Sequence, residues 1–332
     1  MGAPAAGVSP SRVDGASPLP RDHHDLAPAN HDDFSPIFIV GFPRSGTTLL
    51  ATVLSRHSRI AVTPETLFME QVFDDATDPA VMLARVAGSR RCRDLGLDAD
   101  VVAANFTARP PTYCWLFRVL LETYAADAGK DFVAEKSPLH LLHVPTLAQW
   151  YPRARFLLLV RDGRDCVLSM LKVPWAHNSV LRHSAEWRRR MGKARRLYDS
   201  HRQTIHIVRY EELLLAPERE LRNAMAFLGL AFERIQLSPS TASSAVPGWE
   251  KAWKSKAYDV PDASRVAAWK READPATLLA MESVMRDELA AWGYEVIDRR
   301  LDPAKALAGS IFASDSFKKI QKAFRRLRAA TW

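Results

Sequence analysis

From Pro36 onward, short apolar runs alternate along the chain with longer segments whose apolar residues recur at helical spacing. This alternation predicts parallel strands joined by crossover helices. Strands of such a sheet are covered on both faces and therefore read as near-continuous apolar runs. Four segments have this character: Ile37 to Val40, Phe132 to Glu135, Phe156 to Val160 and Ile205 to Val208. The predicted fold class is α/β, a parallel sheet flanked by helices.

Helical periodicity fills the intervals between these strands, and no internal repeat or second strand-rich region is visible. The predicted helices are Thr47 to Ser55, Tyr113 to Ala126, Leu139 to Trp150, Ser179 to His201, Glu218 to Leu228 and Pro275 to Trp292. One domain over residues 35–300 is the simplest division. It follows a segment, 1–34, that is predicted to be disordered because it holds too few apolar residues to offset its ordering entropy.

Each predicted strand ends at a polar cluster. These clusters are Gly41 to Thr48, Lys136-Ser137-Pro138, Arg161 to Arg164 and Arg209 to Glu212. In an open parallel sheet, ligands bind outside the carboxyl ends of the strands. We therefore expect the four clusters to face one crevice.

Composition narrows the class further. The chain has 332 residues, of which 47% are hydrophobic and 25% charged, and this is typical of an enzyme-sized globular protein. Cys92, Cys114 and Cys166 are too few and too scattered for a disulfide framework or a metal site, so we expect reduced thiols. The chain begins without a signal-peptide pattern and has no long apolar run, which predicts a cytoplasmic protein.

The formal charge of +8 is concentrated at one end of the chain. Residues 301–332 place apolar side chains on one side of a predicted helix, with lysines and arginines around the rest: Phe317, Ile320, Phe324 and Leu327 form the apolar side. Two interpretations stay open, a terminal helix docked on the domain and peripheral adsorption to an anionic membrane. No basic groove with interleaved aromatic residues is visible, so we expect no nucleic-acid partner.

The first polar cluster resembles a phosphate-binding loop without its lysine. Gly41 and Gly46 stand at the spacing of the glycines in G-x-x-x-x-G-K-[ST], between a predicted strand and a predicted helix, but Thr47 replaces the lysine. Backbone amides of such a loop converge on an anion together with the positive end of the helix. Hydroxyls of Ser45, Thr47 and Thr48 add donors, so a phosphate is expected to bind there.

The missing lysine bears on which phosphate binds. That lysine reaches the β and γ phosphates of a nucleoside triphosphate, and no strand-ending Asp is evident to hold magnesium. A P-loop kinase that uses ATP and magnesium is therefore the alternative rather than the first choice. Arg44 instead offers a planar fork of donors for an oxyanion beside the phosphate. A phosphate that carries a second, smaller anion would fit.

These residues carry a family resemblance. Pro43-Arg44-Ser45-Gly46-Thr47-Thr48 resembles the 5'-phosphosulfate loop of sulfotransferases that use 3'-phosphoadenosine 5'-phosphosulfate (PAPS), and it is closest to the protein-tyrosine sulfotransferases and their bacterial relatives. The run from Phe156 to Arg164, followed by Ser169, resembles the 3'-phosphate site of that family, in which Arg161 and Ser169 hold the phosphate. Tyr210 matches a position that contacts the nucleotide. The resemblance covers about Pro36 to Tyr294 and implies the sulfotransferase fold, PAPS as co-substrate and no metal.

The resemblance also implies catalytic roles. Sulfuryl transfer to a hydroxyl needs in-line attack, a base and positive charge on the leaving oxygen. Glu65 matches the general base, Lys136 the residue that steadies the bridging oxygen, and Arg44 shares that task. The alternatives are that Glu65 is an ordinary acidic residue in a first helical turn and that Lys136 points to solvent. The rival bases are three histidines: His57, His140 and His143.

The acceptor is less determined. In the tyrosine sulfotransferases, basic residues that help to bind acidic peptides follow the catalytic glutamate. At the matching positions after Glu65, this chain has Leu67 and Gln71. A hydroxyl of a small molecule, lipid or carbohydrate is therefore favoured over protein tyrosine. Aromatic residues that could line its pocket, or equally fill the core, are Trp115, Phe117, Trp175 and Trp187. A lid is expected over residues 243–260, with Lys251, Lys254 and Lys256, and the oligomeric state stays open.

Overall fold

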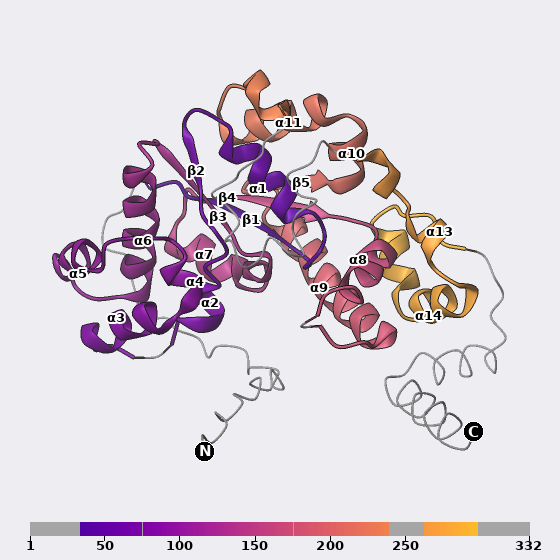
Figure 1. The fold of residues 1–332 in the computed structure, drawn as a ribbon, viewed down its shortest axis with the longest axis horizontal. Helices are drawn as coiled ribbons and strands as arrows, with labels where there is room; N and C mark the ends of the chain where they lie inside the picture. The colour runs from indigo at the N-terminus through magenta and orange to yellow at the C-terminus, as the bar shows by residue number, and fades with distance from the viewer. Residues whose placement is uncertain (1–33, 75, 175, 239–261, 298–332) are drawn as a thin grey trace, which may run out of the picture. The chain divides into compact units, whose positions relative to one another are not determined.

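A sheet of five parallel strands organises the protein, with the strand order β2-β3-β1-β4-β5 (Figure 1). The computed structural model describes residues 34–74, 76–174, 176–238 and 262–297, all of which belong to one compact unit. The strands are β1 Ile37–Gly41, β2 Ile60–Val62, β3 Phe132–Lys136, β4 Arg155–Val160 and β5 Ile205–Arg209. The predicted α/β class is confirmed, and each of the four predicted strands is present with its ends shifted by at most one residue.

Strand β2 was not predicted. Its three residues are too few to show a period, and their conformation is set by pairing with β3, in which Ile60 lies beside Phe132 and Val62 beside Ala134. The pairing continues as the Thr63 amide donates to the Ala134 carbonyl over 2.9 Å. The residues that follow this edge strand therefore run beside the carboxyl end of β3.

Alternate residues of the central strand enter two separate cores. Ile37 and Ile39 pack with one cluster, and Phe38 and Val40 with the other, because successive side chains of a strand point to opposite faces. The first core is covered by α1 Thr47–Ser55, α10 Tyr210–Leu215 and α11 Pro217–Leu228. The second is covered by α6 Tyr113–Asp127, α7 Val144–Trp150, α8 Gly163–Met170, α9 Val180–Ser200 and α14 Pro275–Ala291.

Shorter helices occupy the connections. They are α2 Phe68–Gln71, α3 Pro79–Gly88, α4 Arg90–Arg93, α5 Ala99–Thr107 and α13 Trp269–Glu272, with the 3-10 helices η1 Pro138–His143, η2 Arg234–Leu237 and η5 Ala263–Arg265. The segment from α2 to α5 lies between β2 and β3 in the chain (Figure 1). Five of the six predicted helices are present with ends shifted by at most one residue.

The sixth predicted helix, Leu139 to Trp150, is wrong as a single element. The chain forms η1 over Pro138–His143 and only then α7 over Val144–Trp150. Pro145 explains the break, because a proline has no amide hydrogen and its ring clashes with the carbonyl four residues earlier. The tighter 3-10 turn buries His140 completely.

Several predictions fall outside the described residues: the disordered segment up to residue 33, Trp175, the lid over 243–260 and the tail over 301–332. Phe34, at the edge of that first segment, packs edge-on against Tyr151 with ring centroids 5.3 Å apart. Among the described residues, no helix has both the length and the apolar character needed to cross a membrane.

Close packing between α8 and α9 generates a test of the fold. A Cβ atom on Gly163 would lie 2.6 Å from Cδ2 of Trp187, whose side chain is completely buried. Gly163→Ala should therefore lower the free energy of unfolding by about 1–3 kcal/mol, the usual cost of overpacking. Chemical denaturation followed by tryptophan fluorescence measures the change.

The matched control is Gly88→Ala at the end of α3, where an added Cβ meets nothing within 4 Å. That variant should unfold at the same denaturant concentration as the wild type. Equal stability of the two variants would contradict the packing of Trp187 against Gly163.

Candidate functional site

The turn from β1 to α1 has the geometry of an anion-binding loop. Arg44 has φ 70° and Gly46 has φ 103°, so the backbone turns through two left-handed residues within three positions. The Ser45 amide donates to the Phe42 carbonyl over 3.1 Å, and α1 begins at Thr47 without a side-chain cap. The first amides of a helix have no partner within the helix, so those of α1 are available for an anion.

Only glycine fits at position 46. A Cβ there would lie 2.3 Å from Cδ2 of Tyr210, the first residue of α10, in addition to the strain of the left-handed backbone. The close approach lets the Tyr210 ring sit under the loop, where the Arg161 guanidinium stacks on it at 4.1 Å from the centroid. The carboxyl ends of β1, β4 and β5 therefore meet at one ring.

Two arginines converge at this point. Nη1 of Arg161 donates to the Arg44 carbonyl over 3.1 Å, and Nε of Arg44 donates to Oγ of Ser169 over 3.1 Å. Burial and then the neighbouring Arg161 charge lower the pKa of Arg44, whereas Glu65 acts in the opposite direction. Guanidinium groups held so close repel each other, and an anion bound between them would remove the repulsion.

Two buried donors, one after β1 and one after β4, have no hydrogen-bond partner in the described part of the chain. They are Oγ of Ser45 and Nε of Arg161. A buried donor without a partner costs about 1–3 kcal/mol, and a bound anion is one of the groups that removes this cost. Phosphate oxygens could satisfy each of these groups, so the residues present fit a phosphate-bearing ligand.

Arg161 also has an acidic neighbour one helical turn further along the chain, Asp165. Oδ2 of Asp165 lies 3.8 Å from Nη2 of Arg161, too far for a hydrogen bond. The other carboxylate oxygen of Asp165 accepts from the Trp269 amide over 2.7 Å. The pair is a loose ion pair, and an incoming anion would approach a guanidinium that a carboxylate only partly compensates.

A buried ionic network fixes the turn that follows β4. Arg164 donates from two nitrogens to the Asp162 carboxylate, over 3.0 and 2.7 Å, and from a third to Glu282 over 2.6 Å. Its guanidinium also stacks on Trp269 at 3.6 Å from the ring centroid. Bidentate contacts of this kind fix direction as well as position. Arg164 therefore anchors the turn to α13 and α14.

Glu65 and Lys136 form a buried ion pair. Nζ of Lys136 lies 2.8 Å from Oε1 of Glu65, and the lysine side chain has no solvent exposure, so the interpretation that it points to solvent is wrong. Glu65 is not in a first helical turn either, because α2 begins at Phe68. Nη1 of Arg91 lies 3.7 Å from the other carboxylate oxygen. The Glu65 carboxylate therefore lies between two cationic side chains.

The rival histidines have other partners. Nε2 of His57 lies 3.0 Å from the Ala231 carbonyl oxygen, and His143 lies 3.7 Å from Glu70. Burial opposes a charge on His140, but the carboxylates of Glu135 and Glu70 outweigh it and raise its pKa to about 10. Nε2 of His140 accepts from the Met69 amide over 3.3 Å and Nδ1 lies 2.9 Å from Oε2 of Glu135, so both ring nitrogens have partners within the protein.

The remaining candidate side chains are mostly structural. Phe117 and Trp187 are completely buried in the second core, and the Trp115 indole donates to the Phe106 carbonyl over 3.0 Å. The cysteines are free thiols, and burial raises the pKa of Cys92 and of Cys114 to about 11. Thiols this weakly acidic are poor nucleophiles, so the cysteines take no part in the site.

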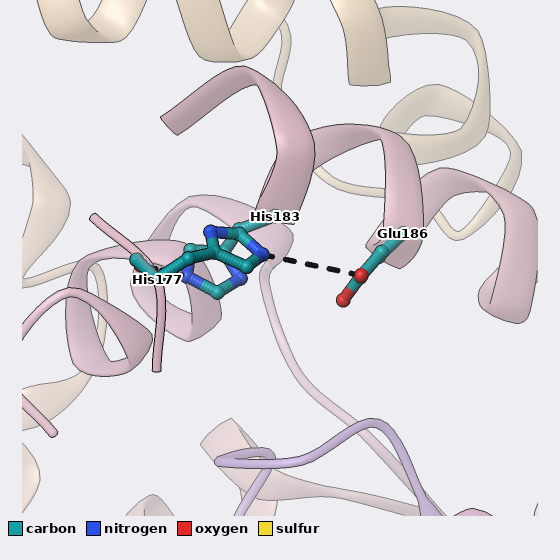
Figure 2. A group of neighbouring side chains, drawn as sticks. All are labelled: His177, His183 and Glu186. Carbon is teal, nitrogen blue, oxygen red and sulfur yellow. Dashed lines mark hydrogen bonds and ion pairs between the residues drawn. The ribbon is translucent and has the colours of Figure 1, made fainter. Parts of the chain in front are cut away.

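A group of potential metal ligands lies at the start of α9. His183 and Glu186 are one turn apart on that helix, and His177 precedes it (Figure 2). The two imidazole rings stack with centroids 3.8 Å apart and planes 15° from parallel, and Nε2 of His177 lies 4.0 Å from Glu186. An imidazole nitrogen binds a metal in the plane of its ring at about 2.0–2.1 Å. Stacked planes do not direct both lone pairs at one ion, so this arrangement is a stacked pair.

The parallel sheet, with a lysine-free loop of phosphate-binding type after its central strand, defines an α/β protein with a P-loop-like fold. The model of the Sulfotransferase family matches residues 36–234, more than half of the chain. The chain belongs to this family.

Curated relatives agree with this family. Protein-tyrosine sulfotransferase 2 of Gallus gallus is 29% identical over 209 residues, which cover 59% of this chain and 51% of that protein. Nodulation protein NoeE of Sinorhizobium fredii (strain NBRC 101917 / NGR234) is 26% identical over 340 residues, which cover 90% of this chain and 75% of that protein. The chain spans about half the length of the tyrosine sulfotransferases that it matches over 209 residues.

Solved structures share the fold. The sulfotransferase domain from the curacin biosynthetic pathway superimposes with a TM-score of 0.58 at 19% identity, covering 80% of this chain and 99% of that domain. The sulfotransferase domain from the Synechococcus PCC 7002 olefin synthase superimposes with a TM-score of 0.58 at 19% identity, covering 81% of this chain and 99% of that domain. The sulfotransferase fold is therefore confirmed.

Some residues of the site were missed in the sequence. Arg91 comes from a short helix between β2 and β3, and nothing in its local pattern connects it with Glu65. Asp165 was quoted in no motif, although it lies one turn after Arg161. The signal that could have been read is Glu135, a carboxylate at the end of an apolar strand, because such a group must have buried partners.

Asp165 gives the site a pH dependence. Burial raises its pKa from 3.8 to about 6, against the effect of Arg161. An acid whose pKa is higher in the folded state binds its proton more tightly there, so stability increases as pH falls through about 6. Relative to Asp165→Asn, the wild type should gain about 1 kcal/mol in free energy of unfolding between pH 7.5 and pH 5. Urea denaturation at both pH values measures this difference.

Asparagine retains the acceptor for the Trp269 amide, so the comparison isolates the proton. A stability difference between the two proteins that is the same at both pH values would contradict the assignment.

Proposed function

We propose that this protein transfers a sulfuryl group from PAPS to a hydroxyl acceptor, with Glu65 as general base. The observation that carries the proposal is the meeting of Arg44, Arg161 and Ser169 at the carboxyl ends of β1 and β4. Membership of the Sulfotransferase family supports the reaction class.

Each end of the nucleotide has its own set of donors. The 5'-phosphosulfate is assigned to the loop, where Ser45, Gly46, Thr47 and Thr48 offer hydroxyls and amides and Arg44 offers its guanidinium. The 3'-phosphate is assigned to Arg161 and Ser169, with Tyr210 as a flat surface beneath. A buried donor without a hydrogen-bond partner in the described part of the chain remains for each assigned phosphate, Oγ of Ser45 in the loop and Nε of Arg161 after β4.

The reaction forms a bond between the acceptor oxygen and sulfur and breaks the bond from sulfur to the bridging oxygen of the 5'-phosphate. Glu65 takes the acceptor proton, and Lys136 places a positive charge near the bridging oxygen as negative charge develops on it. An ammonium has three donors, so Lys136 can retain Glu65 at 2.8 Å and still meet the leaving oxygen. Adenosine 3',5'-bisphosphate is the second product.

A small molecule, lipid or carbohydrate is proposed as acceptor in preference to protein tyrosine. Several relatives are named protein-tyrosine sulfotransferases, but Leu67 and Gln71 replace the basic residues expected after the glutamate. The Gln71 side chain accepts from the Ser89 hydroxyl over 3.1 Å, which ties it to α4. A cytoplasmic location and membrane contact through residues 301–332 stay predictions.

The P-loop kinase is not favoured. Thr47 is the first residue of α1, where a kinase loop needs its lysine, and Arg161 with Ser169 would have no role toward ATP. Binding of adenosine 3',5'-bisphosphate is therefore expected of a sulfotransferase, and binding of ATP with magnesium of a kinase.

Arg161→Ala should weaken binding of adenosine 3',5'-bisphosphate by about 10- to 100-fold, because charged hydrogen bonds contribute about 1.5–3 kcal/mol. In the wild type, this nucleotide should raise the melting temperature more than ATP with magnesium does. Thermal-shift titration and calorimetry measure both effects.

Arg202→Ala is the control, because that arginine is exposed and precedes the amino end of β5, away from the loop. Its affinity for the nucleotide should equal that of the wild type. Stronger stabilisation by ATP with magnesium would reverse the ranking of the two functions.

Glu65→Gln should reduce kcat by about 100- to 10,000-fold, the usual contribution of a general base, because an amide cannot accept the acceptor's proton. Affinity for adenosine 3',5'-bisphosphate should stay within about twofold, since Gln retains the shape of the side chain. Labelled PAPS offered to a panel of hydroxyl compounds measures transfer and identifies the acceptor.

Glu122→Gln on α6, where the glutamate pairs with Arg118 on the same helix, is the matched control and should be fully active. Full activity of Glu65→Gln would remove Glu65 as the base.

A further inference from the structure

One buried carboxylate touches both of the segments that carry the reacting groups. Glu135, at the end of β3, has no solvent exposure. Its Oε1 accepts from the Thr66 hydroxyl over 2.8 Å, from the Thr66 amide over 3.3 Å and from the Ser137 hydroxyl over 2.6 Å. Thr66 follows Glu65 in the chain, and Ser137 follows Lys136. A single carboxylate therefore holds the residue after each member of the ion pair.

The hydroxyls continue the connection. Oγ of Ser137 accepts from the Leu67 amide over 3.0 Å, and Oγ1 of Thr66 accepts from the Phe68 amide over 3.2 Å. Thr66 and Ser137 are both completely buried. Residues 66–68 are thus bonded at every backbone amide to a side chain of this group, although they belong to no helix or strand until Phe68.

The segment needs such support. Leu67 has φ 47°, a left-handed conformation that costs a side-chain-bearing residue free energy and persists only where its surroundings enforce it. The bond from its amide to Ser137 supplies that constraint. Without it, the turn after Glu65 would relax, and the carboxylate would leave its position 2.8 Å from Lys136.

His140 completes the arrangement from the other side. Its Nδ1 lies 2.9 Å from Oε2 of Glu135, and its Nε2 lies 3.4 Å from Oε2 of Glu70 on α2. Removing a carboxylate from water is costly unless it is paired and hydrogen-bonded, and Glu135 meets both conditions. The contact with His140 thus favours the ionised form of Glu135, and the negative charge of this carboxylate attracts the Thr66 and Ser137 hydroxyls.

We infer that Glu135, supported by His140, is a positioning residue that holds Glu65 against Lys136 through Thr66 and Ser137. The inference rests on the proposed function for its catalytic part only. Catalytic groups must lie within a fraction of an ångström of their productive positions, and a displacement of about 1 Å can cost about 100-fold in rate. The carboxylate bonds to Thr66 and Ser137 rather than to the nucleotide loop, so we expect its effect on the base and the lysine rather than on nucleotide affinity.

The structural half is tested by hydrogen exchange of single amides, without a substrate. In Ser137→Ala, the Leu67 amide loses its acceptor and should exchange about 10-fold faster or more. Amides of Val133 and Ala134 within β3 should retain their protection. Unchanged exchange at Leu67 would overturn the inference, whatever the protein does chemically.

The catalytic half is tested with labelled PAPS and the acceptor found by screening. Ser137→Ala and Thr66→Val should each lower kcat by about 10- to 100-fold. The KM for PAPS and the affinity for adenosine 3',5'-bisphosphate should stay within about twofold of the wild type. Thr66→Ser restores the hydroxyl and should recover most of the rate.

Ser184→Ala is the control for loss of a buried hydroxyl, since Ser184 is completely buried on α9 and donates to the Val180 carbonyl over 2.8 Å. It should leave kcat unchanged. Faster exchange with an unchanged kcat would reduce Glu135 to a structural role and overturn the positioning. If the wild type binds the nucleotide but transfers no label, the proposed function is wrong, and so is the catalytic half of the inference. Hydrogen exchange of the Leu67 amide would still decide whether Glu135 and its partners hold residues 66–68.

Discussion

The stacking of Arg161 on Tyr210, under a loop that only glycine can complete, is the contact on which the site depends. The ring lies 4.1 Å from the guanidinium and occupies the space where a Cβ of residue 46 would be. Strand ends of β1, β4 and β5 are thereby joined at one point. Because a guanidinium on an aromatic face keeps its donors directed sideways, Arg161 reaches the Arg44 carbonyl and retains a donor for an anion.

Two networks of buried charged groups fix the chain beside this contact. Arg164, with Asp162 and Glu282, fixes the turn after β4, which begins at Arg161. Glu135, with Thr66 and Ser137, lies at the end of β3, beside the Glu65–Lys136 pair. Both networks bury charge, which is tolerated only when every member is paired. Family membership supports sulfuryl transfer as the reaction class, whereas the acceptor, the base and the roles of these residues are proposed.

Much of the fold was readable from the sequence. The four long strands and five of six predicted helices follow from periodicity, because buried apolar faces impose a period that local pattern records. Strand β2 was missed because three residues show no period, and the helix over Leu139 to Trp150 was placed too early because Pro145 restricts where an α-helix can begin. The loop residues were found through spacing alone, since glycine positions in such a turn are set by backbone geometry.

The sequence by itself determined the class of protein, the strand ends that carry polar clusters and the identity of the loop. Tertiary structure alone decided that Lys136 is buried against Glu65, that Arg91 comes from a distant helix to the same carboxylate, and that Glu135 connects the two segments. The reason is physical. Periodicity and turn chemistry are local properties of neighbouring residues, whereas an ion pair or a shared carboxylate depends on which segments the parallel sheet brings side by side.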